Sequence, residues 1–150
     1  MSENKIISPF QIIDWRILSF NSTNSMFYFP ADIEHHWTIK AHIEHLDAEE
    51  EKLRAALQIE FHFRAEHSNG RMSMDGVCVA MCELDKKSME DAETNFQRLL
   101  SRTAMTNCLA NLRVFLLQAG ALHQMGSKQV MLPFVNLNQF AFDEEITFTT

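Results

Sequence analysis

Residues 53–65 read Leu-Arg-Ala-Ala-Leu-Gln-Ile-Glu-Phe-His-Phe-Arg-Ala, and this stretch decides the fold. Apolar side chains occupy every second position from Leu53 to Ala65, with mostly polar side chains between them. A strict period of two is the pattern of a strand, whose side chains alternate between two faces, and it excludes a helix. At ~3.3 Å per residue such a strand is about 40 Å long. We therefore expect a long strand with one face in the core.

The segments around this strand extend the pattern into an antiparallel sheet. Asn69-Gly70 follows it and predicts a tight hairpin, because both residues tolerate the positive φ that a two-residue turn needs. Residues 37–43 alternate in the same way and predict a strand before it. Residues 12–20 predict the first strand, with three apolar side chains on one face: Ile13, Trp15 and Ile17.

The strand predicted at residues 72–84 differs from the others because it is apolar on both faces. Its second face carries Val77, Val79 and Met81. A strand that is apolar on both faces must be covered on both faces, and a single layer of helices covers only one. These three residues are therefore candidates for an oligomer interface.

A long helix is predicted to follow the sheet. Ser88 is the expected cap at its start, and Gly126-Ser127 is its expected end. Weak helix formers at 103–107 predict a break within it. The expected fold is thus α+β, with a four-stranded antiparallel sheet and a long helix on one face, in a single domain over 1–150. The apolar residues at helical spacing are Phe96, Leu99, Leu100, Cys108, Leu112, Phe115, Leu116, Ala119 and Leu122.

Composition excludes several classes of function. The formal net charge is -7, which argues against nucleic acid and against an anionic membrane surface. No apolar run is long enough for a signal peptide or a membrane span, so we expect a cytoplasmic protein without membrane insertion. The three cysteines, Cys78, Cys82 and Cys108, lie among apolar residues and are expected to be reduced core residues.

No enzyme motif stands out. The chain has only 4 glycines, and it has neither a phosphate-binding loop nor a Gly-x-Ser-x-Gly turn. His42, Glu44 and His62 could share one face of the sheet, but solvent-exposed histidines on strands are far more common than metal ligands. We expect no enzyme activity, no cofactor and no metal site.

The segment before Trp37 is unusual for a connection between strands. It contains four bulky apolar residues in a row, Met26, Phe27, Tyr28 and Phe29. Loops seldom carry such a cluster, because they lie on the surface. Two interpretations remain open: the cluster lines a binding groove, or it closes the core as a plug.

The order of these features resembles the SecB family of protein-export chaperones. The residues that carry the resemblance are a first strand closing on Leu18-Ser19-Phe20, the aromatic loop before Trp37, and two strands joined by a hairpin. A long helix with Asn107 and Arg113 follows, and then Leu132-Pro133-Phe134-Val135-Asn136-Leu137 and Phe140. The resemblance covers nearly the whole chain, and the Pro-x-Val-Asn segment is its most specific part.

The resemblance implies a function and partners. SecB-like proteins assemble as a homotetramer, a dimer of dimers, and hold unfolded polypeptide clients in apolar grooves without ATP. It implies that residues 26–29 line such a groove against the long helix, with Phe115 on the opposing wall. The resemblance also implies contact with the SecA motor in exporters of this family, through carboxylates beside the Leu/Ile-Ser-Phe element of the first strand. Here the corresponding neighbours are Ile17 and Asn21, which are uncharged and argue against SecA as a partner.

Three functional hypotheses follow from the sequence. The first is an ATP-independent holdase for export-bound or other unfolded chains. Methionine and phenylalanine are suited to it, because promiscuous surfaces use adaptable apolar side chains, and the chain has 9 Met and 12 Phe but 1 Tyr. The second is a SecB-like chaperone dedicated to one client, such as an antitoxin. The third is an oligomer of this fold without chaperone activity.

Overall fold

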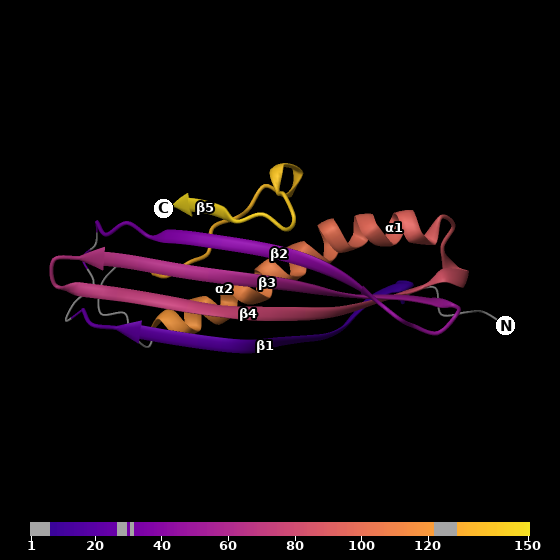
Figure 1. Cartoon of the computed structure of the whole chain (residues 1–150), viewed down its shortest axis with the longest axis horizontal. Helices are drawn as coiled ribbons and strands as arrows, with labels where there is room; N and C mark the ends of the chain where they lie inside the picture. Colours follow the sequence, from indigo (N-terminus) through magenta and orange to yellow (C-terminus); the bar gives the residue numbers. More distant parts are fainter. Residues whose placement is uncertain (1–6, 27–29, 31, 122–128) are drawn as a thin grey trace.

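A computed structural model describes residues 7–26, 30, 32–121 and 129–150 of the chain. It contains an antiparallel sheet of five strands in the spatial order β1-β4-β3-β2-β5, with the helices crossing one face (Figure 1). The strands are β1 (Phe10–Asn24), β2 (His36–Leu46), β3 (Lys52–His67), β4 (Gly70–Asp85) and β5 (Ile146–Thr149). The helical segments are η1 (Lys86–Ser88), α1 (Ala92–Leu99), η2 (Leu100–Ala104), α2 (Met105–Ala121) and η3 (Leu137–Gln139).

The central strands confirm the alternation read from the sequence. β3 pairs with β4 along its whole length, from Lys52 opposite Asp85 to His67 opposite Gly70. Alternate side chains of both strands are buried under the helices. The hairpin is also confirmed, but its loop is Ser68–Asn69, and Gly70 begins β4 with a φ of 141°. The turn therefore lies one residue earlier than predicted.

The first strand is longer than predicted, and its faces are assigned differently. β1 contains two irregularities against β4, between Ile12 and Asp14 and between Ile17 and Ser19. An extra residue in one strand of a pair reverses the alternation beyond it. Ile12, Trp15 and Ile17 consequently pack against the core, whereas Ile13 is 52% exposed. The predicted face with Ile13 was wrong at that position.

The sheet has a fifth strand, so the prediction of four strands was wrong. Residues 146–149 pair antiparallel with residues 36–39 of β2 and form one edge of the sheet. Four residues after an acidic turn are too few to show a clear period of two, which is why the sequence did not reveal this strand.

The long helix is confirmed with differences at its start. α1 and α2 are continuous through η2, a π-helical segment that overlaps the predicted break. The N-cap of α1 is Asp91, in a left-handed conformation, and Ser88 instead ends η1 and donates its hydroxyl proton to Asp85. The Ser88 cap was therefore wrong. Leu122 and the predicted end at Gly126-Ser127 lie outside the described residues.

The core lies between the sheet and the helices and includes all three cysteines as free thiols. Burial raises the pKa of Cys78 to about 12 and the pKa of Cys82 to about 11. It also raises the pKa of Cys108 far above its ordinary value. The expectation of buried, unbridged cysteines is confirmed.

These thiols lead to a prediction about alkylation and alkaline stability. The folded protein should resist iodoacetamide, with all three thiols reacting only after unfolding in urea, because thiolates are the reactive species. Stability should fall as the pH rises above about 8.5, since the unfolded thiols then lose protons that the folded thiols keep. Mass spectrometry and urea unfolding at several pH values would measure both effects. Rapid labelling of folded protein at Cys78 would contradict the burial.

Candidate polypeptide-binding surface

An aromatic cluster lies where β1 meets α2 on the helix-bearing face. The ring of Phe20 is 4.9 Å from that of Phe115 and 6.4 Å from that of Phe61, measured between centroids. Phe115 is half-buried and packs against the core. The structure therefore places this expected groove residue at the boundary between core and surface, and its contact with a client remains a prediction.

The loop before β2 is described only in part. Met26 is 6% exposed and belongs to the core cluster, and its backbone N–H donates to the side-chain oxygen of Asn24. Phe27, Tyr28 and Phe29 lie outside the described residues. For Met26 the position agrees with the plug interpretation, and a role of residues 26–29 in client binding remains a prediction.

Arg113 on α2 holds the chain that returns from the helix. Its Nε donates to the carbonyl oxygen of Leu132 at 2.7 Å, and one Nη donates to that of Pro133 at 3.3 Å. Its guanidinium carbon lies 4.1 Å from the centroid of the Phe134 ring, which is 89% exposed. Partial burial lowers the pKa of Arg113, but a guanidinium stays protonated at neutral pH. A fixed cation thus orients an apolar ring that faces solvent.

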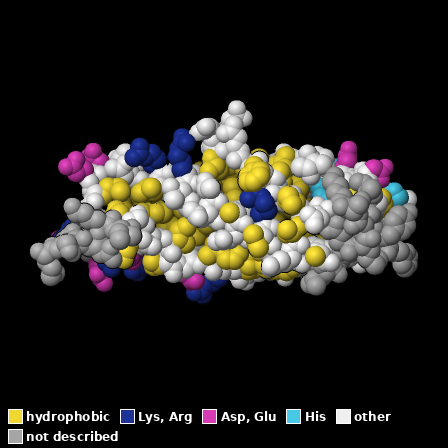
Figure 2. Space-filling model, turned by 180° about the vertical axis from the view of Figure 1, so that it is seen from behind, with side chains coloured by type: hydrophobic (Ala, Val, Ile, Leu, Met, Phe, Trp, Pro, Cys, Tyr) yellow, Lys and Arg dark blue, Asp and Glu magenta, His cyan; other side chains and the backbone are white. Residues whose placement is uncertain are grey.

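An apolar groove of about 370 Å³ lies between this returning segment and the edge strand β5. One side is formed by residues 133–136, Gln139 and Phe140, and the other by Ile146, Phe148 and Thr150. Figure 2 shows hydrophobic side chains along the middle of the helix-bearing face. This groove was not predicted. One signal in the sequence points to it, namely Arg113 within an apolar helix, whereas the four residues of β5 are too few to give a clear pattern.

Replacing Arg113 by methionine should loosen this side of the groove. The change removes two hydrogen bonds from a charged donor and leaves two carbonyl groups without that partner, so we expect a loss of about 1–3 kcal/mol in unfolding free energy. Urea unfolding would measure it. Arg102→Met, at an exposed position earlier in the same helical region, is the matched control and should change stability little. Equal stability of both variants would show that Arg113 does not anchor the segment.

The opposite face of the sheet carries the three candidate interface residues. Val77, Val79 and Met81 of β4 point away from the helices and are half-exposed. Exposed Leu18 and Ile13, at the two irregularities of β1, lie on the neighbouring edge strand. An apolar strip therefore follows β4 on a face that no described segment of this chain covers, and its use as an interface remains a prediction.

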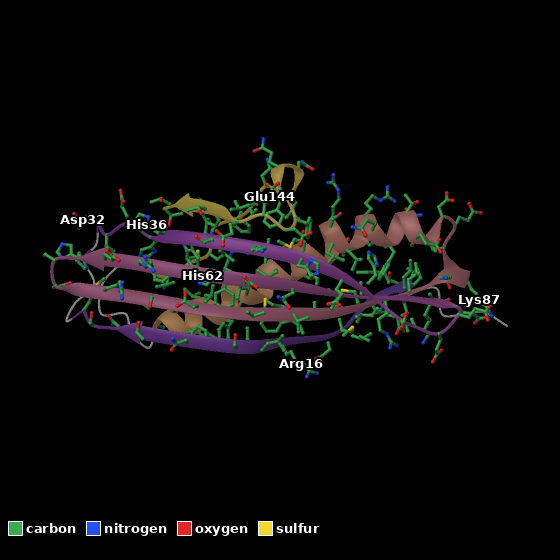
Figure 3. All side chains as sticks on the ribbon, in the orientation of Figure 1. Arg16, Asp32, His36, His62, Lys87 and Glu144 are labelled. Carbon is green, nitrogen blue, oxygen red and sulfur yellow. The ribbon has the colours of Figure 1, made fainter. Side chains whose placement is uncertain are left out.

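Charged pairs border this strip. Glu83 accepts hydrogen bonds from Arg54 and lies 3.2 Å from the ammonium group of Lys52. The Arg54 hydrogen bond, followed by Lys52, lowers the pKa of Glu83. His62 and Asp75 lie opposite each other and are 2.7 Å apart, two positions along β4 from Val77, and Figure 3 labels His62 on the sheet.

The three residues considered for a metal site do not come together. His62 lies opposite Thr38 on β2, which places His42 four residues further along that strand, or about 13 Å away. His42 instead lies 2.6 Å from Asp143 in the turn before β5. Within the described ranges, no three His, Cys, Asp or Glu side chains are placed to hold a metal ion.

The fold is similar to that of a solved structure. This structure is the Rv1957 SecB-like chaperone of Mycobacterium tuberculosis, in complex with a ChAD peptide from the Rv1956 HigA1 antitoxin. The similarity covers 85% of this chain and 91% of that one, with a TM-score of 0.62 and 16% sequence identity. The fold is SecB-like.

Other comparisons give no match. No protein-family model matches the chain, and no curated protein sequence matches it. Among the described helices, none is both long and apolar enough to cross a membrane. The SecB-like fold therefore rests on the three-dimensional similarity and on the sequence features that predicted it.

Proposed function

We propose that this protein is a chaperone that binds extended, apolar polypeptide segments without a nucleotide. The observation that carries the proposal is the groove beside β5, where Phe134 is held in solvent by Arg113. Exposed apolar side chains around a groove are typical of interaction sites. The client side chains would fill the apolar groove, and the net charge of -7 would favour basic or uncharged segments.

A dedicated client is the preferred form of this proposal. The similar Rv1957 chaperone is in complex with an antitoxin peptide, which supports a chaperone that serves one partner, such as an antitoxin. A broad holdase is the second candidate, supported by the abundance of Met and Phe and by exposed apolar side chains such as Val114 and Met131. A cytoplasmic location is part of both forms, in keeping with three unbridged cysteines.

Protein export through SecA has less support. Ile17 packs toward the core, so it is unavailable on the outer face, and Asn21, at the other end of Leu18-Ser19-Phe20, is uncharged. Asp75 is the acidic residue opposite Asn21, and it is engaged with His62. We do not include SecA among the proposed partners.

A binding panel tests the proposal and separates its two forms. Several unrelated, chemically unfolded proteins would be diluted into buffer with this protein and no nucleotide, and aggregation would be followed by light scattering. Suppression for most of them would favour the broad holdase. Suppression for none, together with tight binding to one sequence on an array of short peptides, would favour the dedicated form. No binding to any unfolded chain or peptide would leave only a role in assembly.

We also propose that the protein is a homo-oligomer. In this assembly another copy covers the apolar strip on β4. Val79→Glu would place a charge in the middle of that strip, and such a charge must be desolvated when the surfaces meet. We expect sedimentation to show smaller particles for this variant with unchanged circular dichroism. The control is Gln58→Glu, opposite Val79 on β3, which should have a smaller effect. An unchanged particle size for Val79→Glu would contradict an interface at this strip.

A further inference from the structure

The edge strand β5 adds only four residues to a sheet whose other strands are much longer. Residues 146–149 lie along residues 36–39 of β2 (Figure 1). Ile146 and Phe148 line the groove, and Thr147 and Thr149 are exposed. No side chain of β5 is buried. The β2 residues that pair with β5 include Trp37 and Ile39, and both side chains are fully buried.

β5 is held to β2 by four paired positions, by backbone hydrogen bonds at its end and by side-chain pairs on its outer face. The backbones of His35 and Thr150 exchange two hydrogen bonds, at 3.0 and 2.9 Å. On the outer face, the hydroxyl groups of Thr38 and Thr147 are 3.4 Å apart. Short segments with half-exposed apolar side chains and solvent-exposed hydrogen bonds open most easily in folded proteins.

The turn before β5 is fixed to β2 at one point. Asp143 has a positive φ of 64°, and its backbone N–H donates to the carbonyl oxygen of Ala41. Its carboxylate is hydrogen-bonded to the imidazole of His42. This anchor lies outside the paired residues, so β5 can detach while the turn stays in place.

The surface under β5 is suited to another strand. A bare strand edge presents unpaired N–H and C=O groups, which an extended peptide can pair with by strand addition. The sequence of β5, Ile-Thr-Phe-Thr, alternates apolar residues with threonine, and three of its four residues are β-branched. Such a pattern is common in unfolded segments of proteins that form sheets. An extended client could therefore reproduce both the backbone hydrogen bonds of β5 and its side chains in the groove.

We propose that β5 occupies the client site of its own chain and is displaced from β2 when an extended client segment pairs with residues 36–39. The inference rests on the proposed function, because it assigns a binding mode to the same groove. β5 then acts as an internal competitor, and the measured affinity for a client is reduced by the fraction of molecules in which β5 is in place. Weak clients are excluded, and segments that pair better than Ile-Thr-Phe-Thr are selected.

A reversible lock tests the displacement. Opposite residues of antiparallel strands alternate between pairs with and without backbone hydrogen bonds to each other. His35 and Thr150 form a hydrogen-bonded pair, so Thr38 and Thr147, three positions along, form a pair without such bonds. The side chains of such a pair lie close together. Thr38→Cys combined with Thr147→Cys should therefore form a disulfide on the outer face. The probe is a reduced, carboxymethylated protein that stays unfolded, and its binding would be followed by fluorescence anisotropy. We expect oxidation to weaken binding about tenfold or more, and reduction to restore it.

A second pair of cysteines is the matched control. Thr23→Cys with Ser73→Cys joins β1 to β4, where the native hydroxyl groups are 2.8 Å apart. This bond is equally exposed and crosses two strands that are not proposed to separate. Its oxidation should leave client binding unchanged.

A release variant tests the inference from the opposite direction. Ile146→Ser with Phe148→Ser removes the apolar side chains of β5 and should raise client affinity about threefold to tenfold if β5 is a competitor. Lower affinity would show that these side chains serve as a fixed wall, and it would overturn the inference. Equal binding by the oxidised and reduced lock would also overturn it while leaving the proposed function in place. Absence of binding in every form, the release variant included, would overturn both.

Discussion

A Phe134→Ser variant is expected to bind an unfolded client about thirtyfold more weakly than the unaltered protein, because aromatic hot spots at interfaces contribute about 2 kcal/mol and about 1.4 kcal/mol is tenfold in affinity. The ring is 89% exposed and touches the Arg113 guanidinium, so its removal deletes contact area for a client and little internal packing. Thermal unfolding should consequently change little. Anisotropy with a permanently unfolded protein and a thermal melt would measure the two effects.

Ile7→Ser is the matched control for this variant, since Ile7 is also an exposed apolar residue. It precedes Phe10, which pairs with Leu84 at the end of the sheet away from β5. The control should bind the client normally. Similar weakening by both changes would indicate general surface stickiness, and no weakening by Phe134→Ser would remove the groove from the binding site.

A Gly76→Ala variant is expected to lose about 3 kcal/mol of unfolding free energy, a typical result of forcing an extra methyl group into a filled core. An added Cβ would lie 2.5 Å from the carbonyl oxygen of Ser19 and 2.6 Å from the ring carbon Cζ of Phe61. Ser19 belongs to the irregular part of β1, and its backbone cannot move without shifting Phe20. Urea unfolding monitored by circular dichroism would measure the change.

A loss of unfolding free energy in Gly76→Ala would indicate the close contact, whereas a gain would indicate only the usual effect of alanine on the unfolded chain. Replacing glycine by alanine in a strand usually stabilises a protein slightly, because the unfolded chain loses freedom. Ser73→Ala, on the outer face of the same strand, controls for small changes in β4 and should alter stability by less than about 1 kcal/mol. Unchanged or higher stability of Gly76→Ala would contradict the tight approach of β1 to β3 across this glycine.

The sheet was predictable where one physical signal extended over many residues. β3 and β4 alternate along their whole length, and burial under the helices follows that alternation residue by residue. β1 was harder, because one extra residue at each irregularity reverses the faces and nothing in the local sequence marks its position. β5 was missed because four residues give too short a period and because its partner lies more than a hundred positions away in the chain.

The candidate site was predictable only in outline. Arg113 and Leu132-Pro133-Phe134 were recognised as part of a resemblance, but their mutual contact is a tertiary event. The position of Met26 could not be predicted either. An apolar residue in a connecting loop can pack into the core or bind a partner, and Met26 is buried in the core. The apolar strip on β4 could be predicted because a strand that is apolar on both faces leaves a visible excess in its sequence, and its use as an interface stays a prediction.

Crosslinking from inside the groove is the most direct test of the central claim, that an extended client binds there without a nucleotide. A photoreactive benzoylphenylalanine would replace Phe134 in one sample and Ile7 in another. Each would be illuminated with a permanently unfolded protein and no ATP. We predict a crosslinked product from position 134 and none from position 7, with the folded form of the same test protein giving no product. Retention of the client with no crosslink from position 134, or equal crosslinking from both positions, would contradict binding in the groove.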